Sequence, residues 1–475
     1  MFSLSFINAI PSLFPLSRRI VTLAWPVLVA QLASIGMVLL DTLIVGRYST
    51  THLAAIALGG GIYVTLMLGM AGVLLALTPI IAQNYGAGHM DRIGADARDG
   101  FWLAAILSVS GFGLLSFPHY WLALANLEPE LEAVAADYLY LLAFSLPAAL
   151  GYRVFHATAN ALGYPLPLMY IALTETLLHA LLAFMLVGGL PALFLPALGA
   201  NGAAISQIIV NWLAFFIACF LLARHPRFAS FAIFSIPLAQ LRPRLAALKA
   251  LLRLGLPMGL SYLIEVSAFT LMAFFIARLG VAEVSGYRIA ANFSALTYML
   301  PLSLATATSA LVAQAAGARQ ERLAVATISA GQMTGILIAM TVALLLYFFR
   351  FPLVRLATPD AQVVEIAAMM ILYIAAYQFF DAIQTIAAFS LRAYKISFLP
   401  LCIHLCCFWG LGIGLGFWLA FYAPIPQGSA GFWQATVLAT IAASFFLGGL
   451  LLIVVKSRLR QNIVACATTQ EKSHE

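Results

Sequence analysis

Long, uninterrupted apolar stretches limit what this chain can fold into more than any other feature. Cutting the sequence at its charged, proline and glycine residues leaves twelve stretches of roughly 20 residues or more. An apolar helix needs about 20 residues to cross the hydrocarbon of a bilayer. The stretches are 20–44, 53–83, 99–118, 133–160, 166–190, 198–223, 248–277, 284–314, 323–349, 362–391, 397–421 and 430–456.

The composition excludes most other classes of protein. Hydrophobic residues make up 63% of the chain and charged residues 9%, with a mean hydropathy of +1.01. A soluble domain carries roughly a quarter of its residues as charged side chains, so a soluble enzyme, a disordered chain and a nucleic-acid-binding protein are excluded. The stretches are continuous and do not alternate in period two, which excludes a membrane β-barrel. We predict an all-α integral membrane protein.

The five cysteines have no metal-ligand spacing and no paired framework. We interpret them as small apolar side chains, so neither a structural metal nor a disulfide scaffold is expected.

The distribution of Lys and Arg predicts the orientation. With the N-terminus inside, 18 of these residues fall in inside loops and 5 in outside loops. Arg392 belongs to the inside set, and Arg153 lies within a span. Basic residues concentrate in cytoplasmic loops, so both termini are predicted to be cytoplasmic. Arg18 and Arg19 follow the first apolar residues, which is not the pattern of a cleaved signal peptide, and the first span is expected to stay.

The two halves of the chain are related by a repeat at an offset of 231 residues. Pro26 matches Pro257, and the motif Ala82-Gln-Asn-Tyr-Gly-Ala returns as Ala313-Gln-Ala-Ala-Gly-Ala. Six spans per copy is an even number, so both copies enter the membrane from the same side. We predict twelve transmembrane helices in two six-helix bundles, related by a pseudo-twofold axis along the membrane normal.

The basic, proline-bearing segment near the middle of the chain is the expected linker. The predicted parts are an N-terminal cytoplasmic segment (1–17), an N-terminal bundle (18–223), a cytoplasmic linker (224–247), a C-terminal bundle (248–456) and a cytoplasmic tail (457–475).

Four acidic residues lie well inside predicted spans, namely Asp41, Glu175, Glu265 and Asp381. An ionisable side chain near the bilayer centre is costly and marks a functional site by default. Asp41 shares a helix face with Ser34, although it is also close enough to the outer loop to be an interfacial residue.

The second half offers the best candidate site. Tyr377, Asp381 and Gln384 follow the spacing i, i+4 and i+7, so a phenol, a carboxylate and an amide share one helix face. Together with Glu265 they form either an oxygen site for a small cation or a pair of carboxyl groups that accepts a proton. The alternative for Glu265 is a protonated side chain with a hydrogen bond to another helix.

Two further pairs of ionisable residues lie in the first half. Glu175 and His179 are four residues apart on the fifth span, and either satisfy each other or form a second protonation or substrate site. Arg153 and His156 on the fourth span are interpreted as structural.

From about residue 16 to about residue 459 the chain resembles the multidrug and toxic compound extrusion (MATE) family, in its NorM-like bacterial branch. The segments that carry the resemblance are Trp25-Pro-Val-Leu-Val-Ala-Gln31, Gly36-Met-Val-Leu-Leu-Asp-Thr42, Arg253-Leu-Gly-Leu-Pro257, Glu265-Val266, Ala291-Asn-Phe-Ser294, Tyr377-Gln-Phe-Phe-Asp-Ala-Ile-Gln384 and Ser390-Leu-Arg-Ala-Tyr-Lys395.

The resemblance implies an antiporter of the bacterial inner membrane that exports organic, mostly cationic and lipophilic, compounds. Na⁺ or H⁺ enters in exchange, without a further cofactor, and the expected state is a monomer in the lipid bilayer. Residues matching Glu265, Tyr377 and Asp381 hold the cation in such proteins, and the acid matching Asp41 is the functional carboxylate of the first bundle. The chain departs from the family at His179, where Asn is usual, and at Glu175, where an apolar or small residue is usual.

We regard four residues as accessory to these sites, namely Glu175, His179, Gln384 and Asn292. Aromatic rings that can stack on a planar cation are Tyr262, Phe269, Phe293, Tyr298 and Phe380, although ordinary helix packing explains most of them. The alternatives are a lipid-linked precursor flippase of the same superfamily, an intramembrane enzyme, for which the chain has no P-loop or nucleophile elbow, and a passive channel.

Overall fold

The computed structural model describes residues 10–123, 127–189, 196–234 and 242–471, with side chains from Leu13 to Gln461 within these ranges. Parts of the predicted N-terminal segment, linker and tail lie outside the described residues. The described chain is helical and contains no strand.

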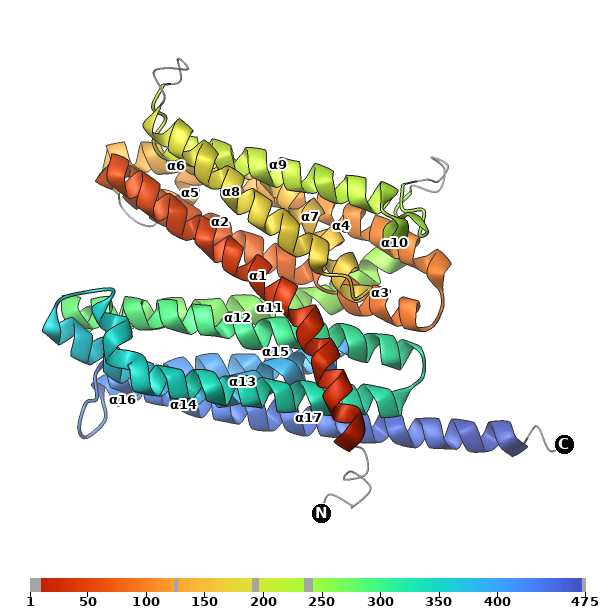
Figure 1. The fold of residues 1–475 in the computed structure, drawn as a ribbon. Coiled ribbons are helices and arrows are strands. Elements are labelled where there is room, and N and C mark those ends of the chain that lie inside the picture. Colours follow the sequence, from red (N-terminus) through yellow and green to blue (C-terminus); the bar gives the residue numbers. More distant parts are fainter. Residues whose placement is uncertain (1–9, 124–126, 190–195, 235–241, 472–475) are drawn as a thin grey trace. The chain divides into compact units, whose positions relative to one another are not determined.

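Figure 1 shows the helices in chain order. The helices of the first half are α1 (Ile10–Tyr48), α2 (Thr50–Leu74), α3 (Leu77–Gly86), α4 (Met90–Leu115), α5 (Pro118–Leu122), α6 (Pro129–Ala143), α7 (Leu146–Ala161), α8 (Leu166–Gly188), α9 (Ala200–Arg224) and α10 (Pro226–Ala229).

The second half has the same kind of elements. They are α11 (Leu245–Ile276), the short 3₁₀ helix η5 (Ala277–Leu279), α12 (Val281–Gly317), α13 (Glu321–Arg355), α14 (Ala361–Ala393), α15 (Phe398–His404), the π-helix η6 (Leu405–Leu415), α16 (Gly416–Phe421) and α17 (Ser429–Glu471).

Every predicted apolar stretch is mostly helical in its described part. Ten helical segments of the described chain are long and apolar enough to cross a membrane, with α2–α3, α11–η5 and α15–η6–α16 each counted as one. α6 and α7, which are bent by 46° relative to each other, make an eleventh when they are counted as one span. α4 covers most of the predicted stretch 99–118, but it begins at Met90 and carries Asp91 in its first turn. By length and composition α4 is not among those crossings in the described residues.

Two helices extend beyond the predicted spans. α1 begins at Ile10 and not near residue 20, and α17 continues to Glu471, past the predicted end at 456. Charged side chains stop an apolar stretch but do not stop a helix, because Arg, Lys and Glu are good helix formers. α1 and α17 therefore continue beyond the predicted apolar stretches into polar sequence.

Proline accounts for the bend between α6 and α7. Pro147 lies in the first turn of α7, where it cannot donate a backbone hydrogen bond to the preceding turn. Pro257 and Pro301 lie inside α11 and α12. The span from Phe398 to Phe421 changes from α to π geometry directly after His404, and such wide turns are rare in helices.

The chain folds into two compact units, and the division passes through helices. The C-unit comprises residues 1–25, 82–88 and 260–475, and the N-unit comprises residues 26–81 and 89–259. α1 therefore changes unit at Pro26, and α11 changes unit just after Gly259. The predicted bundle boundaries at 223 and 248 describe the sequence repeat, which is a different division of the chain from these compact units. They stay a prediction.

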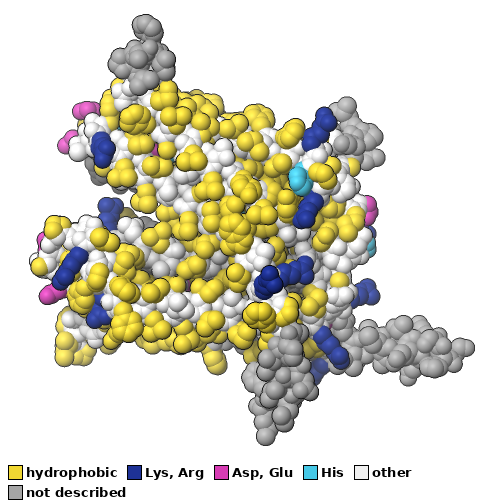
Figure 2. Space-filling model, viewed as in Figure 1, with side chains coloured by type: hydrophobic (Ala, Val, Ile, Leu, Met, Phe, Trp, Pro, Cys, Tyr) yellow, Lys and Arg dark blue, Asp and Glu magenta, His cyan; other side chains and the backbone are white. Residues whose placement is uncertain are grey.

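The surface of the helices is apolar, as expected for contact with lipid. Large hydrophobic side chains such as Val109, Phe184 and Phe445 are at least two-thirds exposed, at 75%, 67% and 76%. Figure 2 shows apolar side chains over most of the visible surface, while Lys and Arg lie near the ends of helices. This is the distribution of a multi-pass membrane protein.

The two copies of the repeated Ala-Gln motif contact each other within the C-unit. A Cβ atom on Gly86 would lie 1.9 Å from the backbone oxygen of Gln314, and a Cβ atom on Gly317 would lie 2.0 Å from that of Gln83. The same backbone contact thus occurs twice with the roles exchanged. Glycine is required at both positions, since any side chain would overlap with the backbone.

Candidate functional site

The predicted polar face of α14 is buried inside the C-unit. Tyr377 is 5% exposed, Asp381 5% and Gln384 2%. The face points toward α12 and α15, as its hydrogen bonds show. The hydroxyl of Tyr377 is hydrogen-bonded to that of Ser294 on α12. The amide of Gln384 reaches His404 at the end of α15.

Asp381 has one carboxylate oxygen satisfied and one free. Gln384 donates a hydrogen bond from Nε2 to Asp381 Oδ1 over 3.0 Å. His404 Nε2 lies 3.2 Å from Gln384 Oε1, which fixes the orientation of the amide between the two residues. Among the described residues nothing donates to Asp381 Oδ2, which is buried. A buried anionic oxygen without a donor is an available ligand for a cation or a proton.

Glu265 reaches the same region from α11. Its Oε2 accepts a hydrogen bond from the hydroxyl of Tyr298 on α12, at a long 3.5 Å. The charges that act on Glu265 are those of Asp381 and Arg392. The structure therefore places both acids of the predicted cation site within electrostatic reach of each other, although no direct hydrogen bond joins them in the described chain.

Arg392 is a part of this region that the sequence interpretation missed. The residue lies in the last turn of α14, just beyond the predicted end of the span at 391, and is only 7% exposed. Its guanidinium lies 4.3 Å from the ring of Phe389 and 5.5 Å from that of Tyr262. An arginine can be buried in this way when aromatic faces receive its charge.

The other predicted residues of the C-unit differ in their exposure and in their contacts. Asn292 is exposed and makes no hydrogen bond among the described residues, unlike the buried Ser294 two positions on. Phe269 and Phe293 pack against the buried cluster around Tyr377 and Trp433. Phe380 packs edge to face on Phe379, with ring centroids 5.1 Å apart. Packing is the observed role of these three rings.

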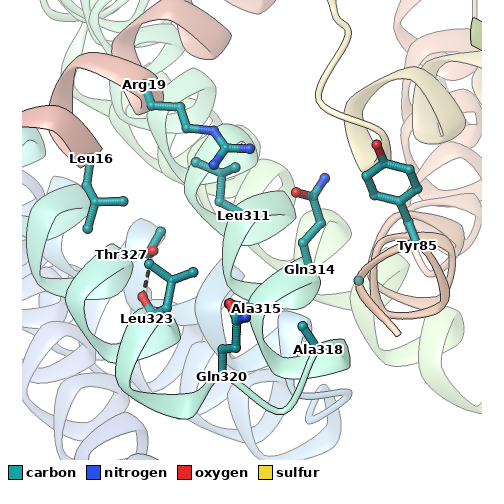
Figure 3. A pocket seen from close by; sticks show the side chains of 11 residues that line it. Leu16, Arg19, Tyr85, Leu311, Gln314, Ala315, Ala318, Gln320, Leu323 and Thr327 are labelled. Atoms are coloured by element: carbon teal, nitrogen blue, oxygen red, sulfur yellow. Dashed lines mark hydrogen bonds between the residues drawn. The ribbon is translucent and has the colours of Figure 1, made fainter. Parts of the chain in front are cut away.

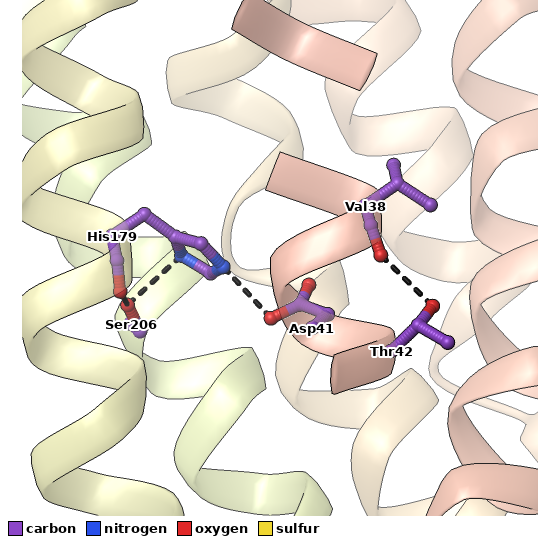
Figure 4. A network of polar contacts seen from close by, with 5 residues as sticks. All are labelled: Val38, Asp41, Thr42, His179 and Ser206. Atoms are coloured by element: carbon purple, nitrogen blue, oxygen red, sulfur yellow. Dashed lines mark hydrogen bonds and ion pairs between the residues drawn. The ribbon is translucent and has the colours of Figure 1, made fainter. Parts of the chain in front are cut away.

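In the N-unit, Asp41 belongs to a chain of three hydrogen-bonding side chains (Figure 4). Asp41 Oδ1 lies 2.8 Å from His179 Nε2, and His179 Nδ1 lies 2.9 Å from the hydroxyl of Ser206. The three residues come from α1, α8 and α9. His179 and Ser206 are fully buried, whereas the Asp41 side chain is 13% exposed.

The predicted pairing of Glu175 with His179 is wrong. Both ring nitrogens of His179 are engaged by residues on other helices, so none is left for Glu175. The charge that acts on Glu175 is that of Arg153 on α7. Asn160 Nδ2 donates to His156 Nδ1 over 3.2 Å. Spacing along one helix suggested the wrong partner because the neighbouring helices approach His179 more closely.

The described residues contain no group of three or more His, Cys, Asp or Glu side chains that could hold a metal ion. A site for Na⁺ at Glu265, Tyr377 and Asp381 would rest on two carboxylates and a phenol, which are hard oxygen ligands of the kind that alkali and alkaline-earth cations accept.

Long apolar helices that enclose hydrogen-bonded acidic side chains define a multi-pass membrane transporter. The chain belongs to the MatE family, whose model matches residues 26–185 and 257–418.

The similarity to known proteins covers nearly the whole chain. A probable multidrug resistance protein NorM of Aromatoleum aromaticum is 45% identical, over 95% of this chain and 97% of that protein. The multidrug resistance protein MdtK of Pectobacterium atrosepticum is 34% identical, over 91% of this chain and 94% of that protein.

Solved structures match the fold. A eukaryotic MATE transporter aligns with a TM-score of 0.82 at 18% identity, over 95% of this chain and 98% of that one. The Vibrio cholerae MATE transporter VcmN in its bent form aligns with a TM-score of 0.79 at 19% identity, over 94% of this chain and 99% of that one. These matches confirm the predicted fold class of an all-α membrane protein with twelve helices in two bundles.

Proposed function

We propose that the protein is a secondary antiporter that exports organic, mostly cationic and lipophilic, compounds in exchange for Na⁺ or H⁺. Its relatives are named as multidrug resistance proteins, and the family is one of transporters, not of enzymes. The observation that carries the proposal is the free, buried Oδ2 of Asp381 inside a spanning helix. Such an anion is costly in a membrane unless it binds a cation or a proton.

Exchange follows from competition for this negative charge. Asp381, Glu265 and Tyr377 supply the oxygen ligands, and Gln384 fixes the orientation of the Asp381 carboxylate. A bound Na⁺ or H⁺ neutralises the acids and weakens their attraction for an organic cation. The reverse holds when the organic cation is bound. Because each ligand lowers the affinity for the other, inward flow of one drives outward flow of the other.

The placement in the cell belongs to the same proposal. The relatives named above are bacterial, which supports the bacterial inner membrane as the location. The excess of Lys and Arg in the predicted inside loops supports cytoplasmic termini. A monomer suffices, since both bundles are encoded in one chain.

The test is transport in proteoliposomes with the variant Asp381→Asn. The amide keeps the shape of the carboxyl group and removes its charge, so we expect cation-driven export of a fluorescent organic cation such as ethidium to be abolished. A Na⁺ gradient and a pH gradient are imposed separately. Undiminished export by the variant under either gradient would contradict the proposal.

Asp360→Asn is the matched control. Asp360 caps the N-terminus of the same helix, accepting from the backbone N–H groups of Gln362 and Val363. Asn caps a helix about as well as Asp does, so the same loss of charge outside the span should leave export unchanged.

A further inference from the structure

Two cavities of the C-unit share one basic side chain, that of Arg19 near the start of α1. The first cavity has a volume of about 210 Å³ and is enclosed by α1, the end of α3, the end of α12 and the start of α13 (Figure 3). The second has a volume of about 360 Å³ and lies along α1 itself. All the residues that line them belong to the C-unit.

The lining of the first cavity combines apolar side chains with hydrogen-bonding groups. Leu16 and Leu311 are among the apolar residues. Arg19, Tyr85 and Gln320 contribute a guanidinium, a phenol and an amide from three different parts of the C-unit, as Figure 3 shows. Within the described chain none of these three side chains has a hydrogen-bond or ion-pair partner. A cavity of this composition suits a ligand with an apolar part and a polar head.

The charge of the lining is positive and is not compensated. Arg18 lines the second cavity beside Arg19, and both side chains are exposed. The side chain of Arg18 likewise has no partner among the described residues. No Asp or Glu is among the described residues that line either cavity. The neighbouring acid, Glu321, is buried and accepts a hydrogen bond from the hydroxyl of Tyr394. The two cavities therefore attract an anion.

The two arginines lie where a bilayer presents anions. They directly precede the apolar stretch that begins at Ile20, at the predicted inside boundary of the first span. Lipid phosphates lie at this depth, and anionic lipids give the cytoplasmic leaflet its negative surface potential. Phe14 and Leu23 line the second cavity next to the arginines. These apolar side chains offer contact to an acyl chain and would serve no purpose for a water-soluble anion.

We propose that the two cavities that share Arg19 bind one anionic phospholipid, whose phosphodiester pairs with the Arg19 guanidinium. A guanidinium donates two parallel hydrogen bonds to phosphate oxygens. The acyl chains contact Phe14 and Leu23 in the second cavity. Tyr85 and Gln320 form hydrogen bonds to hydroxyl groups of the headgroup in the first.

The same lining selects the headgroup. An ammonium group, as in phosphatidylethanolamine or phosphatidylcholine, would lie close to arginines and find no carboxylate in either cavity. A glycerol headgroup is uncharged and bears hydroxyl groups, so phosphatidylglycerol is the best match. The bound lipid connects α1 to α3 and α13, and it should stabilise the C-unit because it binds only the folded protein.

The test measures lipid binding to the full chain in detergent by native mass spectrometry. We expect one phosphatidylglycerol to bind at least about tenfold more tightly than phosphatidylcholine, as is typical of a hydrogen bond between charged groups. Arg19→Gln should remove this preference. Phosphatidylglycerol should also raise the midpoint of thermal unfolding of the wild type but not of Arg19→Gln. Equal binding of the two lipids by the wild type would overturn the proposal.

Gln320→Trp tests the cavity without changing any charge. Gln320 is exposed and its side chain does not cap α13, so the substitution leaves the helix intact. The larger indole occupies part of the first cavity. Binding of phosphatidylglycerol should weaken at least about fivefold, and binding equal to that of the wild type would overturn the site.

Arg92→Gln is the matched control. Arg92 is also an exposed arginine of the predicted inside set, but it lies on α4 and lines neither cavity. Its loss should change binding less than about twofold, since diffuse attraction to an anionic lipid is weak for a single side chain. Equal losses in Arg92→Gln and Arg19→Gln would mean general surface charge and overturn the site.

Glycerol 1-phosphate distinguishes a lipid from a soluble phosphate ester, because it carries the same phosphate without acyl chains. It should not displace phosphatidylglycerol at equal concentration. Displacement would overturn the assignment to a lipid. None of these measurements involves transport, so they leave the proposed antiport untouched whichever result is found.

Discussion

Gln384 connects two ionisable residues that are far apart in the sequence. Its Nε2 donates to Asp381 and its Oε1 contacts His404, and all three side chains are buried. Leu has a similar volume but offers neither donor nor acceptor. In Gln384→Leu both partners lose a hydrogen bond without gaining access to water, which costs about 1–3 kcal/mol for a buried polar group. We expect a lower midpoint of thermal unfolding and weaker cation binding.

Gln434→Leu serves as the comparison for that variant. Gln434 donates a single hydrogen bond to the phenol of Tyr373, over 3.1 Å, in a partly buried setting. The loss of stability should be smaller there, and cation binding should not change. Equal effects of the two substitutions on cation binding would show that Gln384 does not position Asp381.

The sequence predicted the residues of the C-unit site better than those of the N-unit site. Tyr377, Asp381 and Gln384 share one helix, so their spacing alone places them on one face. Contacts between helices are different, because they depend on how helices pack. The partners His404 and Ser206 gave no signal, since a histidine or a serine in an apolar stretch is not unusual.

At the scale of the helix, the reciprocal contact between the two Ala-Gln motifs permits no side chain. Gly86→Ala places a methyl group 1.9 Å from the backbone oxygen of Gln314. Backbone cannot rotate away as a side chain can, so overpacking should cost about 1–3 kcal/mol or more. We expect a lower thermal midpoint for Gly86→Ala and likewise for Gly317→Ala, whose Cβ would meet Gln83 at 2.0 Å.

Gly113→Ala tests whether crowding is the cause. Gly113 lies in α4 with no atom within 4 Å of the added Cβ. Alanine is the better helix former, so this substitution should leave the protein equally stable or slightly more so. A loss of stability at Gly113 equal to that at Gly86 would point to the helix backbone and not to the contact.

The bounds and geometry of the helices were predictable only in part. Apolar length predicted the segments that are long and apolar enough to span, because the bilayer sets that length. It also predicted a span over α4, which does not meet this test in the described residues. It did not predict that α1 begins at Ile10 or that α17 reaches Glu471, since helical propensity continues into polar sequence. The π-helix from Leu405 to Leu415 has no sequence signal that we recognise, although it contains three glycines.

At the scale of the molecule, α11 passes from one compact unit to the other near Pro257. Proline removes one backbone hydrogen bond at this point and lets the helix bend. In Pro257→Ala the helix regains that bond and becomes stiffer. We expect export to slow while the binding of tetraphenylphosphonium stays as in the wild type, measured by initial rates and by equilibrium binding.

Pro352→Ala provides the control, because Pro352 also lies inside a helix but α13 belongs entirely to the C-unit. Its effect on the rate of export should be small. If both variants slow export equally, the effect comes from proline in a helix in general. The position of Pro257 near the division between the two units would then not be the cause.

α1 and α11 each contribute residues to both units, and this has a consequence for how such a molecule arises. The first residues of the first half belong to the C-unit, and the first residues of the second half, up to Gly259, belong to the N-unit. A gene encoding a single half would therefore yield a product that lacks one helix segment of its own unit and carries one that belongs to the other unit. Two copies of such a product would complete each other only by exchanging these leading helix segments.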